Sequence, residues 1–253
     1  MNAQFPTPLP PTEWQFPPAT SADEHGFVGA GADLEPSTLI HAYSNAIFPM
    51  PLDPDTGPSE DGEDVEPLIG WWSPPERGIL RFEDLHVSRS LRRSCRRFDV
   101  THNVDFAGVI DGCADPTRPG GWISPAIRSA YVRLHKLGWA HSIEVWEDGA
   151  LVGGLYGVQI AGLFAGESMF RRVTDASKAA VIAMVAAVES IGGSLIDVQW
   201  RTEHLATLGV SAVTQRNYLR LLHNALTSAT PSLGTISDPQ WLSKSQRWLE
   251  LTA

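Results

Sequence analysis

The chain has 253 residues, of which 43% are hydrophobic, and a formal net charge of −10. This length is enough for one large domain or two small ones with a sizeable core, and the acidic balance argues against a simple nucleic-acid binder. The two cysteines, Cys95 and Cys113, indicate neither a disulfide scaffold nor a zinc site. The N-terminus resembles no signal peptide and no long apolar run could span a membrane. We therefore expect a cytoplasmic protein without a membrane-spanning segment.

The predicted elements begin with a loose, proline-rich lead-in over residues 1–25. A short helix is expected from Ser37, because apolar residues follow at helical spacing, and Pro49 and Pro51 end that segment. Residues 52–67 then contain seven acidic residues and no basic one, a composition typical of a solvated, disordered loop. A short strand is predicted from Gly78 to Phe82.

Five arginines follow within the stretch HVSRSLRRSCRRF. They are Arg89, Arg92, Arg93, Arg96 and Arg97. If Ser88 caps a helix there, their side chains crowd two neighbouring faces and could contact phosphates. A solvated helix face remains the alternative.

The clearest helix signal lies in WISPAIRSAYVRLHKLGWAHSIEVW. Ser124 can cap this helix, Pro125 suits its first turn and Gly138 ends it. A strand over residues 141–146, a hairpin turn at Glu147–Gly149 and strands over 151–159 and 163–170 are expected next.

A helix apolar on almost all sides follows from Ala176 to Ile191, so it should lie inside the fold. A strand over residues 194–200 and a last helix from about Thr214 complete the order. This order predicts a mixed α/β fold in which a domain of residues 85–253, with a three-strand core and acyltransferase-like architecture, follows a smaller unit of residues 1–84.

Polar residues on two of these strands attract attention. Asp197 and Gln199 are two residues apart, which places them on one face of a strand, and Glu167 lies on a neighbouring candidate strand. Burying a carboxylate without a partner costs several kcal/mol, so Glu167 should meet a partner. A structural salt-bridge network and a catalytic group both fit this pattern.

Taken together, nine motifs resemble the leucyl/phenylalanyl-tRNA–protein transferase family over roughly residues 26–220. In chain order they are AYSNAIFP, WWSPPERGIL, LHVSRSLRR, GWISPAIRSAYVRLHKLGWAHSIEVW, LVGGLYGV, LFAGESMF, ASKAA, LIDVQ and HLATLG. The resemblance implies a small N-terminal α/β domain followed by a GNAT-like domain. It also implies an enzyme that moves Leu or Phe, with Met as a further candidate, from aminoacyl-tRNA to the N-terminal amine of proteins that begin with Arg or Lys, which marks them for degradation.

The same resemblance implies roles for individual residues. Asp197 and Gln199 match a catalytic relay, although Asp197 fits either a general base or a positioning group, and Glu167 would bind the cationic acceptor terminus. Trp122 would stack on the terminal adenosine, whereas Met50 stands where many relatives have tryptophan. The donor pocket would consist of Leu155, Phe164, Met169 and Ile196, and the five arginines would contact the tRNA backbone.

No metal and no organic cofactor are expected, and the expected oligomeric state is a monomer. An acyl-CoA-dependent GNAT enzyme is the first rival, but RRVTDASKAA lacks the glycines of a pyrophosphate loop. A non-catalytic RNA-binding module would use the arginines and leave Asp197, Gln199 and Glu167 without a role.

Overall fold

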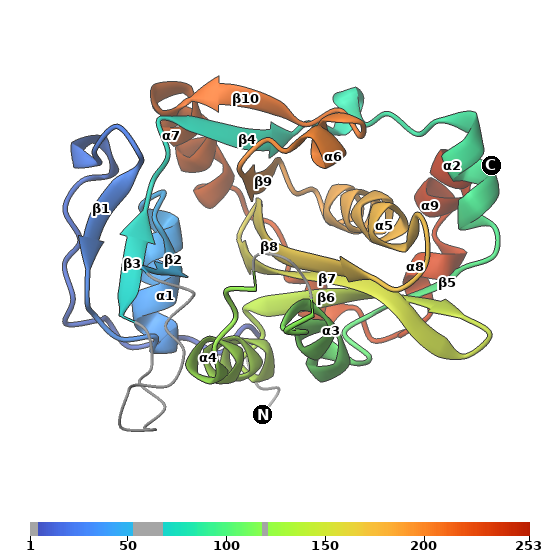
Figure 1. Ribbon diagram of the computed structural model, residues 1–253, viewed down its shortest axis with the longest axis horizontal. Coiled ribbons are helices and arrows are strands. Elements are labelled where there is room, and N and C mark those ends of the chain that lie inside the picture. The colour runs from blue at the N-terminus through green and yellow to red at the C-terminus, as the bar shows by residue number, and fades with distance from the viewer. Residues whose placement is uncertain (1–4, 53–67, 118–120) are drawn as a thin grey trace.

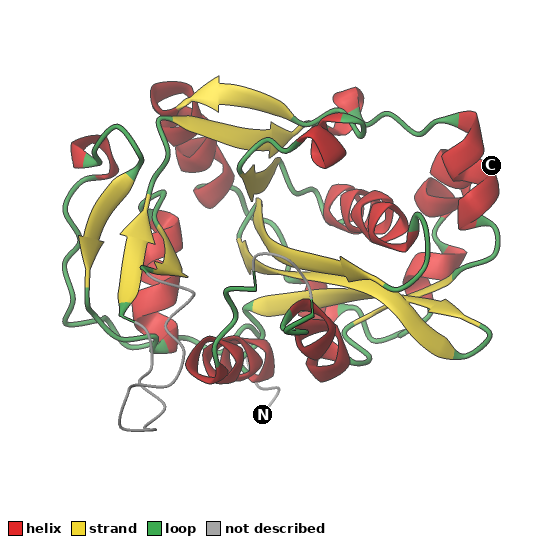
Figure 2. Cartoon of the chain, in the orientation of Figure 1, coloured by secondary structure: helices red, strands yellow, loops and turns green. Residues whose placement is uncertain are grey.

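A computed structural model describes residues 5–52, 68–117 and 121–253. The chain forms two lobes, each built on its own β-sheet (Figures 1 and 2). The mixed α/β class predicted from the sequence is confirmed. The predicted acidic loop falls almost entirely on residues 53–67, which lie outside the described residues.

The smaller lobe contains a three-stranded antiparallel sheet in the order β1-β3-β2 and one helix. Its elements are β1 (Phe27–Ala30), α1 (Pro36–Ser44), β2 (Phe48–Pro51) and β3 (Ile69–Trp72). The helix begins at Pro36, one residue before the predicted start. Pro49 and Pro51 were expected only to end the helix, yet they belong to β2, which tolerates them because it is an edge strand.

The larger lobe has a seven-stranded sheet in the order β10-β4-β9-β8-β7-β6-β5, so the predicted three-strand core was too small. Its strands are β4 (Glu76–Leu80), β5 (Asp99–His102), β6 (Ala140–Glu147), β7 (Ala150–Ile160), β8 (Leu163–Arg171), β9 (Leu195–Gln199) and β10 (Ser211–Thr214). Neighbouring strands are antiparallel except β8 and β9, which are parallel. The β6–β7 hairpin turns at Asp148 and Gly149, both with positive φ, as the sequence predicted.

Helices cover both faces of the larger sheet (Figure 1). The nearly all-apolar α5 (Ala176–Ser190) lies on one face and is buried along most of its length, as predicted. On the opposite face lie α3 (Phe106–Cys113), α4 (Pro125–Lys136) and α7 (Gln215–Leu226). The shorter helices are α2 (Arg89–Cys95), α6 (Glu203–Ala206), α8 (Trp241–Lys244) and α9 (Gln246–Thr252), with 3-10 turns at Ala19–Ser21, Phe82–Asp84 and Leu233–Thr235. None of the helices in the described part of the chain is long and apolar enough to cross a membrane.

Side-chain caps start the helices α2, α4 and α7, and two of these caps, Ser88 and Ser124, were predicted from the sequence. The side chains of Ser88, Ser124 and Thr214 accept hydrogen bonds from the main-chain N–H groups of Leu91, Ile127 and Asn217. Each bond satisfies one of the N–H groups that the first turn of a helix leaves without a partner. The starts of α2, α4 and α7 are thus encoded locally.

The N-terminal segment, predicted to be loose, connects the two lobes. The main-chain N–H of Thr7 donates to the Leu137 carbonyl at 2.8 Å, and Trp139 Nε1 donates to the Thr7 carbonyl at 2.9 Å, both in the larger lobe. Trp14 Nε1 then donates to Asp33 Oδ2 at 2.9 Å in the smaller lobe. In addition, β4 pairs within the larger sheet although it precedes residue 84. The division of the chain into domains of residues 1–84 and 85–253 stays a prediction.

Candidate functional site

A pocket of about 330 Å³ lies where β8 and β9 separate. The two strands pair only from Leu163 opposite Leu195 to Ala165 opposite Asp197. Beyond that point the residues from Gly166 to Met169 on β8 and from Val198 onward on β9 line the pocket. The end of the pairing therefore creates a cleft between two strands that remain neighbours.

Glu167 occupies a β-bulge beside this pocket. Tyr156 pairs with Ser168 and Gly157 pairs with Gly166, which leaves Glu167 as the extra residue of β8. A bulge redirects a side chain out of the regular alternation of a strand. Here the Glu167 carboxylate is buried, with an exposed fraction of 8%.

The partners of Glu167 are neutral. Its Oε2 accepts a hydrogen bond from Tyr131 Oη at 3.0 Å, and its Oε1 accepts one from Gln199 Nε2 at 2.8 Å. Tyr131 in turn shares a hydrogen bond with the hydroxyl of Tyr43 from the smaller lobe. Burial raises the pKa of Glu167 from its ordinary value of 4.5 to about 7, against the lowering effect of the Tyr43 and Tyr131 hydroxyls. The proton occupancy of this carboxyl group therefore changes near neutral pH.

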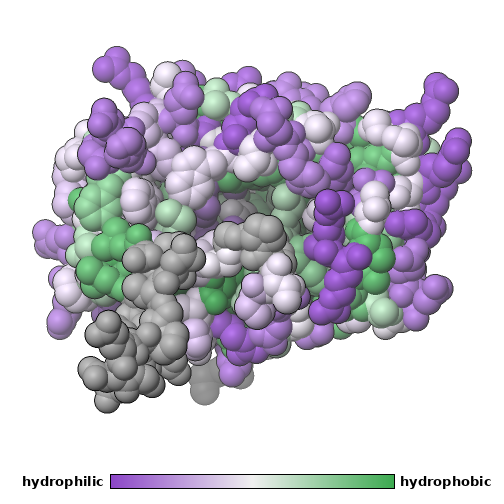
Figure 3. Space-filling model, in the orientation of Figure 1, coloured by the Kyte–Doolittle hydropathy of each residue, from purple (hydrophilic) through white to green (hydrophobic). Residues whose placement is uncertain are grey.

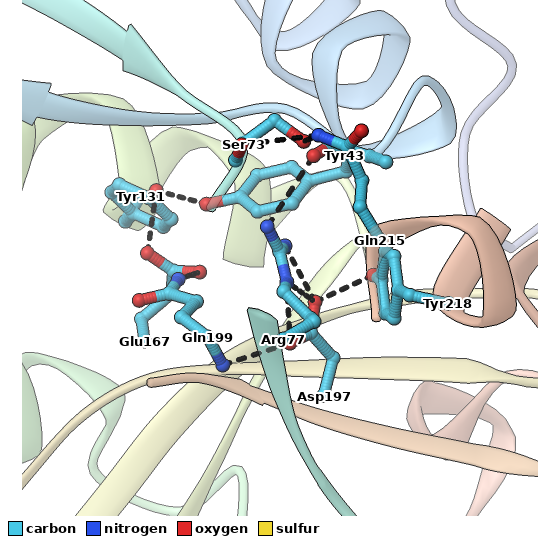
Figure 4. A network of polar contacts seen from close by, with 10 residues as sticks. Tyr43, Ser73, Arg77, Tyr131, Glu167, Asp197, Gln199, Gln215 and Tyr218 are labelled. Atoms are coloured by element: carbon cyan, nitrogen blue, oxygen red, sulfur yellow. Dashed lines mark hydrogen bonds and ion pairs between the residues drawn. The ribbon is translucent and has the colours of Figure 1, made fainter. Parts of the chain in front are cut away.

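Gln199 joins Glu167 to Asp197. It ends β9 with a left-handed backbone, φ 62°, and its main-chain N–H donates to Asp197 Oδ1 at 2.8 Å. Its side chain reaches Glu167. The three residues singled out in the sequence thus form one continuous network (Figure 4).

Asp197 is fully buried, does not line the pocket and is paired with Arg77. Arg77 Nε lies 2.9 Å and 3.0 Å from the two carboxylate oxygens, and its Nη2 lies 2.7 Å from Oδ2. Tyr218 Oη donates to the same Oδ2 at 2.6 Å. The guanidinium group also lies over the rings of Phe48 and Tyr218. Both carboxylate oxygens of Asp197 are therefore occupied by hydrogen-bond donors of the protein.

The sequence analysis missed four members of this network: Tyr43, Arg77, Tyr131 and Tyr218. Arg77 lay one residue before the strand predicted from Gly78, whereas β4 begins at Glu76. The tyrosines carried no signal, because each lies on the apolar stripe of a helix and looks like an ordinary core residue.

The residues proposed for the donor pocket occupy two different places. Leu155 and Met169 line the pocket, together with Val181, Met184 and Leu205 from the helices. Phe164 and Ile196 are buried in the core packed against α5 and are absent from the pocket wall, so their role in donor binding stays a prediction. Met50 and Trp122, the predicted adenosine contacts, both line this same pocket.

The arginine cluster lies on and just after α2. Arg92 Nη1 donates to the main-chain carbonyl of Leu251 at 2.8 Å, and Arg97 pairs with Glu147 at 3.2 Å. Arg89, Arg93 and Arg96 are exposed. The part of the chain that the structure describes contains no group of three or more His, Cys, Asp or Glu residues that could hold a metal ion.

Comparison with known families assigns the chain. The leucyl/phenylalanyl-tRNA protein transferase N-terminal domain matches residues 32–75, and the leucyl/phenylalanyl-tRNA protein transferase domain matches residues 79–223. The chain belongs to this family. The first match covers most of the smaller lobe and the second includes Glu167, Asp197 and Gln199, whereas Arg77 falls between the two.

Individual members of the transferase family are similar over most of their length. A leucyl/phenylalanyl-tRNA–protein transferase of Aromatoleum aromaticum is 45% identical over 215 residues, which is 83% of this chain and 86% of the relative. That of Escherichia coli O157:H7 is 41% identical over 220 residues, 85% of this chain and 88% of the relative. That of Novosphingobium aromaticivorans is 48% identical over 197 residues, 76% and 71% of the two chains.

Proposed function

We propose that this enzyme transfers Leu or Phe, with Met as a further donor, from aminoacyl-tRNA to the N-terminal α-amine of proteins that begin with Arg or Lys, which marks them for N-end-rule degradation. The observation that carries the proposal is the 2.8 Å contact between Gln199 Nε2 and Glu167 Oε1 on the wall of an apolar pocket. It places a polar pair beside a space suited to an apolar side chain. The names of the relatives, which specify tRNA and protein, support the proposal.

The donor side chain would occupy the apolar part of the pocket. Leu155, Met169, Val181 and Met184 form that part, with no charged group among them. We expect unbranched or γ-branched apolar side chains such as Met, Leu and Phe to be accepted before Val and Ile, because branching at Cβ stiffens the side chain and widens it beside the main chain. The aminoacyl ester would then lie near Gln199 and Glu167.

The reaction joins the amine to the ester carbonyl carbon. The amine nitrogen attacks this carbon, a new C–N bond forms, and the bond from the carbonyl carbon to the ribose oxygen breaks, with one amine proton passing to that oxygen. Because the Gln199 amide nitrogen donates to Glu167, its carbonyl oxygen is left to accept a hydrogen bond from the amine. Gln199 would thereby orient the amine for attack.

Asp197 would act as a positioning residue. It accepts hydrogen bonds from Arg77, Tyr218 and the main-chain N–H of Gln199, and it is absent from the pocket wall. A carboxylate so fully engaged is poorly placed to take a proton from the amine. Its contact with the Gln199 main chain holds that residue in its left-handed conformation.

Glu167 would recognise the cationic side chain of the N-terminal Arg or Lys of the acceptor. An ionised carboxylate in a mostly buried site binds a guanidinium or ammonium group more strongly than a neutral side chain, because charge-assisted hydrogen bonds are the stronger ones. The exposed Arg89, Arg93 and Arg96 would contact tRNA phosphates. Protein substrates and charged tRNA are thus the proposed partners, with no organic cofactor.

The proposal is tested by incubating the enzyme with labelled Phe-tRNA and a model protein that begins with Arg. Label should appear at the N-terminus of the protein, and the same protein beginning with Ala should acquire little. Phenylalanyl-CoA in place of Phe-tRNA tests the rival donor and should give no product. Transfer from the CoA ester but not from tRNA would refute the proposal.

A further inference from the structure

Trp200 presents an indole ring at the pocket and has no role in the network described above. It directly follows Gln199 and lines the pocket. With an exposed fraction of 38%, it belongs to a small set of large apolar side chains that remain exposed in the described part of the chain. Of that set, Trp200 alone lines this pocket. Leaving an indole partly in water at a binding pocket favours a ligand that covers it.

The backbone fixes the position of this ring. Gln199 has a positive φ, and the Trp200 main-chain N–H donates to the Val198 carbonyl at 2.7 Å, so the chain turns sharply here. A Cβ atom at Gly78 would lie 2.8 Å from the carbonyl carbon of Trp200, so only glycine allows β4 to approach this closely. The indole packs edge-on against Phe48, with ring centroids 4.9 Å apart and a 90° angle between the rings. Trp200 is thus a built part of the wall.

The neighbours of Trp200 indicate what kind of ligand it would contact. The ring packs on Phe48, two residues before Met50 on β2, and Met50 and Trp122 line the same pocket. The pocket lining thus includes two indoles and the Met50 thioether as well as aliphatic groups such as those of Leu155, Val181 and Leu205. In aminoacyl-tRNA the amino acid is esterified to the ribose of the terminal adenosine, so its base lies next to the aminoacyl group. A flat, uncharged base suits an aromatic wall, since stacking uses the π-face of each partner.

We propose that Trp200 stacks on the terminal adenine of the donor tRNA and supplies the aromatic surface that Met50 does not. This inference rests on the proposed function for the identity of the donor. Trp200 is then a substrate-binding residue that determines donor affinity. An aromatic side chain at position 50 and one at position 200 are then two alternative ways of stacking on the same adenine.

The test measures binding of a small probe, so that it does not depend on transfer activity. The probe is the stable amide analogue in which phenylalanine is joined to the 3′-amino group of 3′-amino-3′-deoxyadenosine, and phenylalanine methyl ester serves as a probe without a base. Titration calorimetry with Trp200→Ala should show roughly 5- to 100-fold weaker binding of the adenosine probe. Affinity for the methyl ester should not change. Trp200→Phe should keep most of the adenosine affinity because it retains an aromatic face.

Two further variants sharpen the experiment. Met50→Trp, introduced into Trp200→Ala, should restore adenosine binding, because the new indole faces the same pocket. Leu249→Ala is the matched control, since Leu249 on α9 is an apolar side chain exposed by 48% that does not line this pocket. That control should leave both affinities unchanged.

The outcomes separate the inference from the function on which it rests. Unchanged adenosine binding in Trp200→Ala would overturn the stacking role even if the wild-type enzyme transfers Phe from tRNA. A loss seen only as a raised KM for the Arg-initiated acceptor would overturn it too, and would assign the indole to a cation on the acceptor. Absence of transfer in the wild-type enzyme, with the expected probe affinities intact, would refute the proposed function and leave the adenosine subsite standing.

Discussion

Arg77 and Asp197 form a buried ion pair between adjacent strands, with Nη2 2.7 Å from Oδ2 and exposed fractions of 2% and 0%. Arg77 lies on β4 and Asp197 on β9, and these strands are paired in the larger sheet. Because Asp197 also holds the Gln199 main chain, the ion pair connects the stability of the sheet to the geometry of the pocket.

Removing Arg77 should destabilise the protein strongly. Arg77→Ala leaves Asp197 as a buried charge without its cation, and breaking a buried pair in this way costs about 3–5 kcal/mol. Arg77→Lys keeps the charge but cannot reproduce the two-pronged contact, so it should recover part of the loss. Urea unfolding measures the free energy. Arg128→Ala, which breaks the exposed pair with Asp111, should cost at most about 1 kcal/mol; an equal loss in both variants would contradict this assignment.

Glu167→Gln should weaken use of the acceptor and spare the donor. A lost charge-assisted hydrogen bond is worth about 1.5–3 kcal/mol, so kcat/KM for the Arg-initiated acceptor should fall by about 10- to 100-fold. The KM for Phe-tRNA should stay near the wild-type value.

Asp197→Asn provides the contrast. It should lower kcat with both substrates saturating, because the Gln199 main chain is then held less firmly. It should also lower stability, because Arg77 loses its carboxylate partner. Steady-state kinetics with each substrate varied separately distinguishes the two variants. If Glu167→Gln instead lowers only kcat/KM for Phe-tRNA, Glu167 belongs to the donor pocket.

Acceptor use should rise with pH through the titration of Glu167. Its pKa of about 7 means that the ionised form, which would bind the cation, increases between about pH 6 and about pH 8. A plot of kcat/KM for the acceptor should therefore inflect near pH 7 in the wild-type enzyme and lose this inflection in Glu167→Gln. The titration of the acceptor amine, near pH 8, should persist in both enzymes.

The raised pKa of Glu167 also determines how the stability of the protein changes with pH. The folded protein keeps the Glu167 proton up to about pH 7, whereas the unfolded chain releases it near its ordinary pKa of 4.5. Relative to Glu167→Gln, the wild-type protein should lose stability as pH rises from about 4.5 to about 7, with no further change above. Urea midpoints at several pH values test this, and parallel curves for the two proteins would show that the shift is absent.

Charge reversal in the arginine cluster should weaken tRNA binding. Arg89→Glu with Arg93→Glu removes two exposed cations from α2, and the loss should be larger at about 50 mM than at about 200 mM salt. Arg92 is left intact because it binds the Leu251 carbonyl. Filter binding with several tRNA sequences measures the effect.

Arg216→Glu with Arg220→Glu makes the same change in charge on the exposed side of α7 and is the matched control. A similar loss in both double variants would mean that tRNA responds to total charge and not to the cluster on α2.

Elements that begin or end at cap and turn residues could be predicted from the sequence. Ser124 and Pro125 define the start of α4, and the turn at Asp148 and Gly149 defines the hairpin, because these signals act over a few residues. By contrast, the larger sheet includes short strands such as β5 and β10 that gain stability only from their neighbours.

From the residue pattern alone, only part of the polar network could be predicted. Glu167, Asp197 and Gln199 were recognisable as polar groups on strands, but the bulge at Glu167 depends on the pairing register with β7. That bulge also lets Phe164 and Met169, an odd number of residues apart, pack on the α5 face together. The tyrosine partners required the tertiary structure, since Tyr43 and Tyr131 lie 88 residues apart.

The N-terminal segment contacts both lobes, whose separation sets the width of the pocket. Met50 comes from the smaller lobe, whereas Trp122 and Glu167 come from the larger one, so any hinge motion between the lobes would open or close the space between these walls. Thr7 is bonded to Leu137 and Trp139 on one side of the junction, and Trp14 is bonded to Asp33 on the other. These bonds oppose such a hinge motion. Both family matches begin after Trp14, at residues 32 and 79, so an enzyme that began at residue 32 would lose the contacts of Thr7 and Trp14 while keeping every residue of the polar network around Glu167 and Asp197.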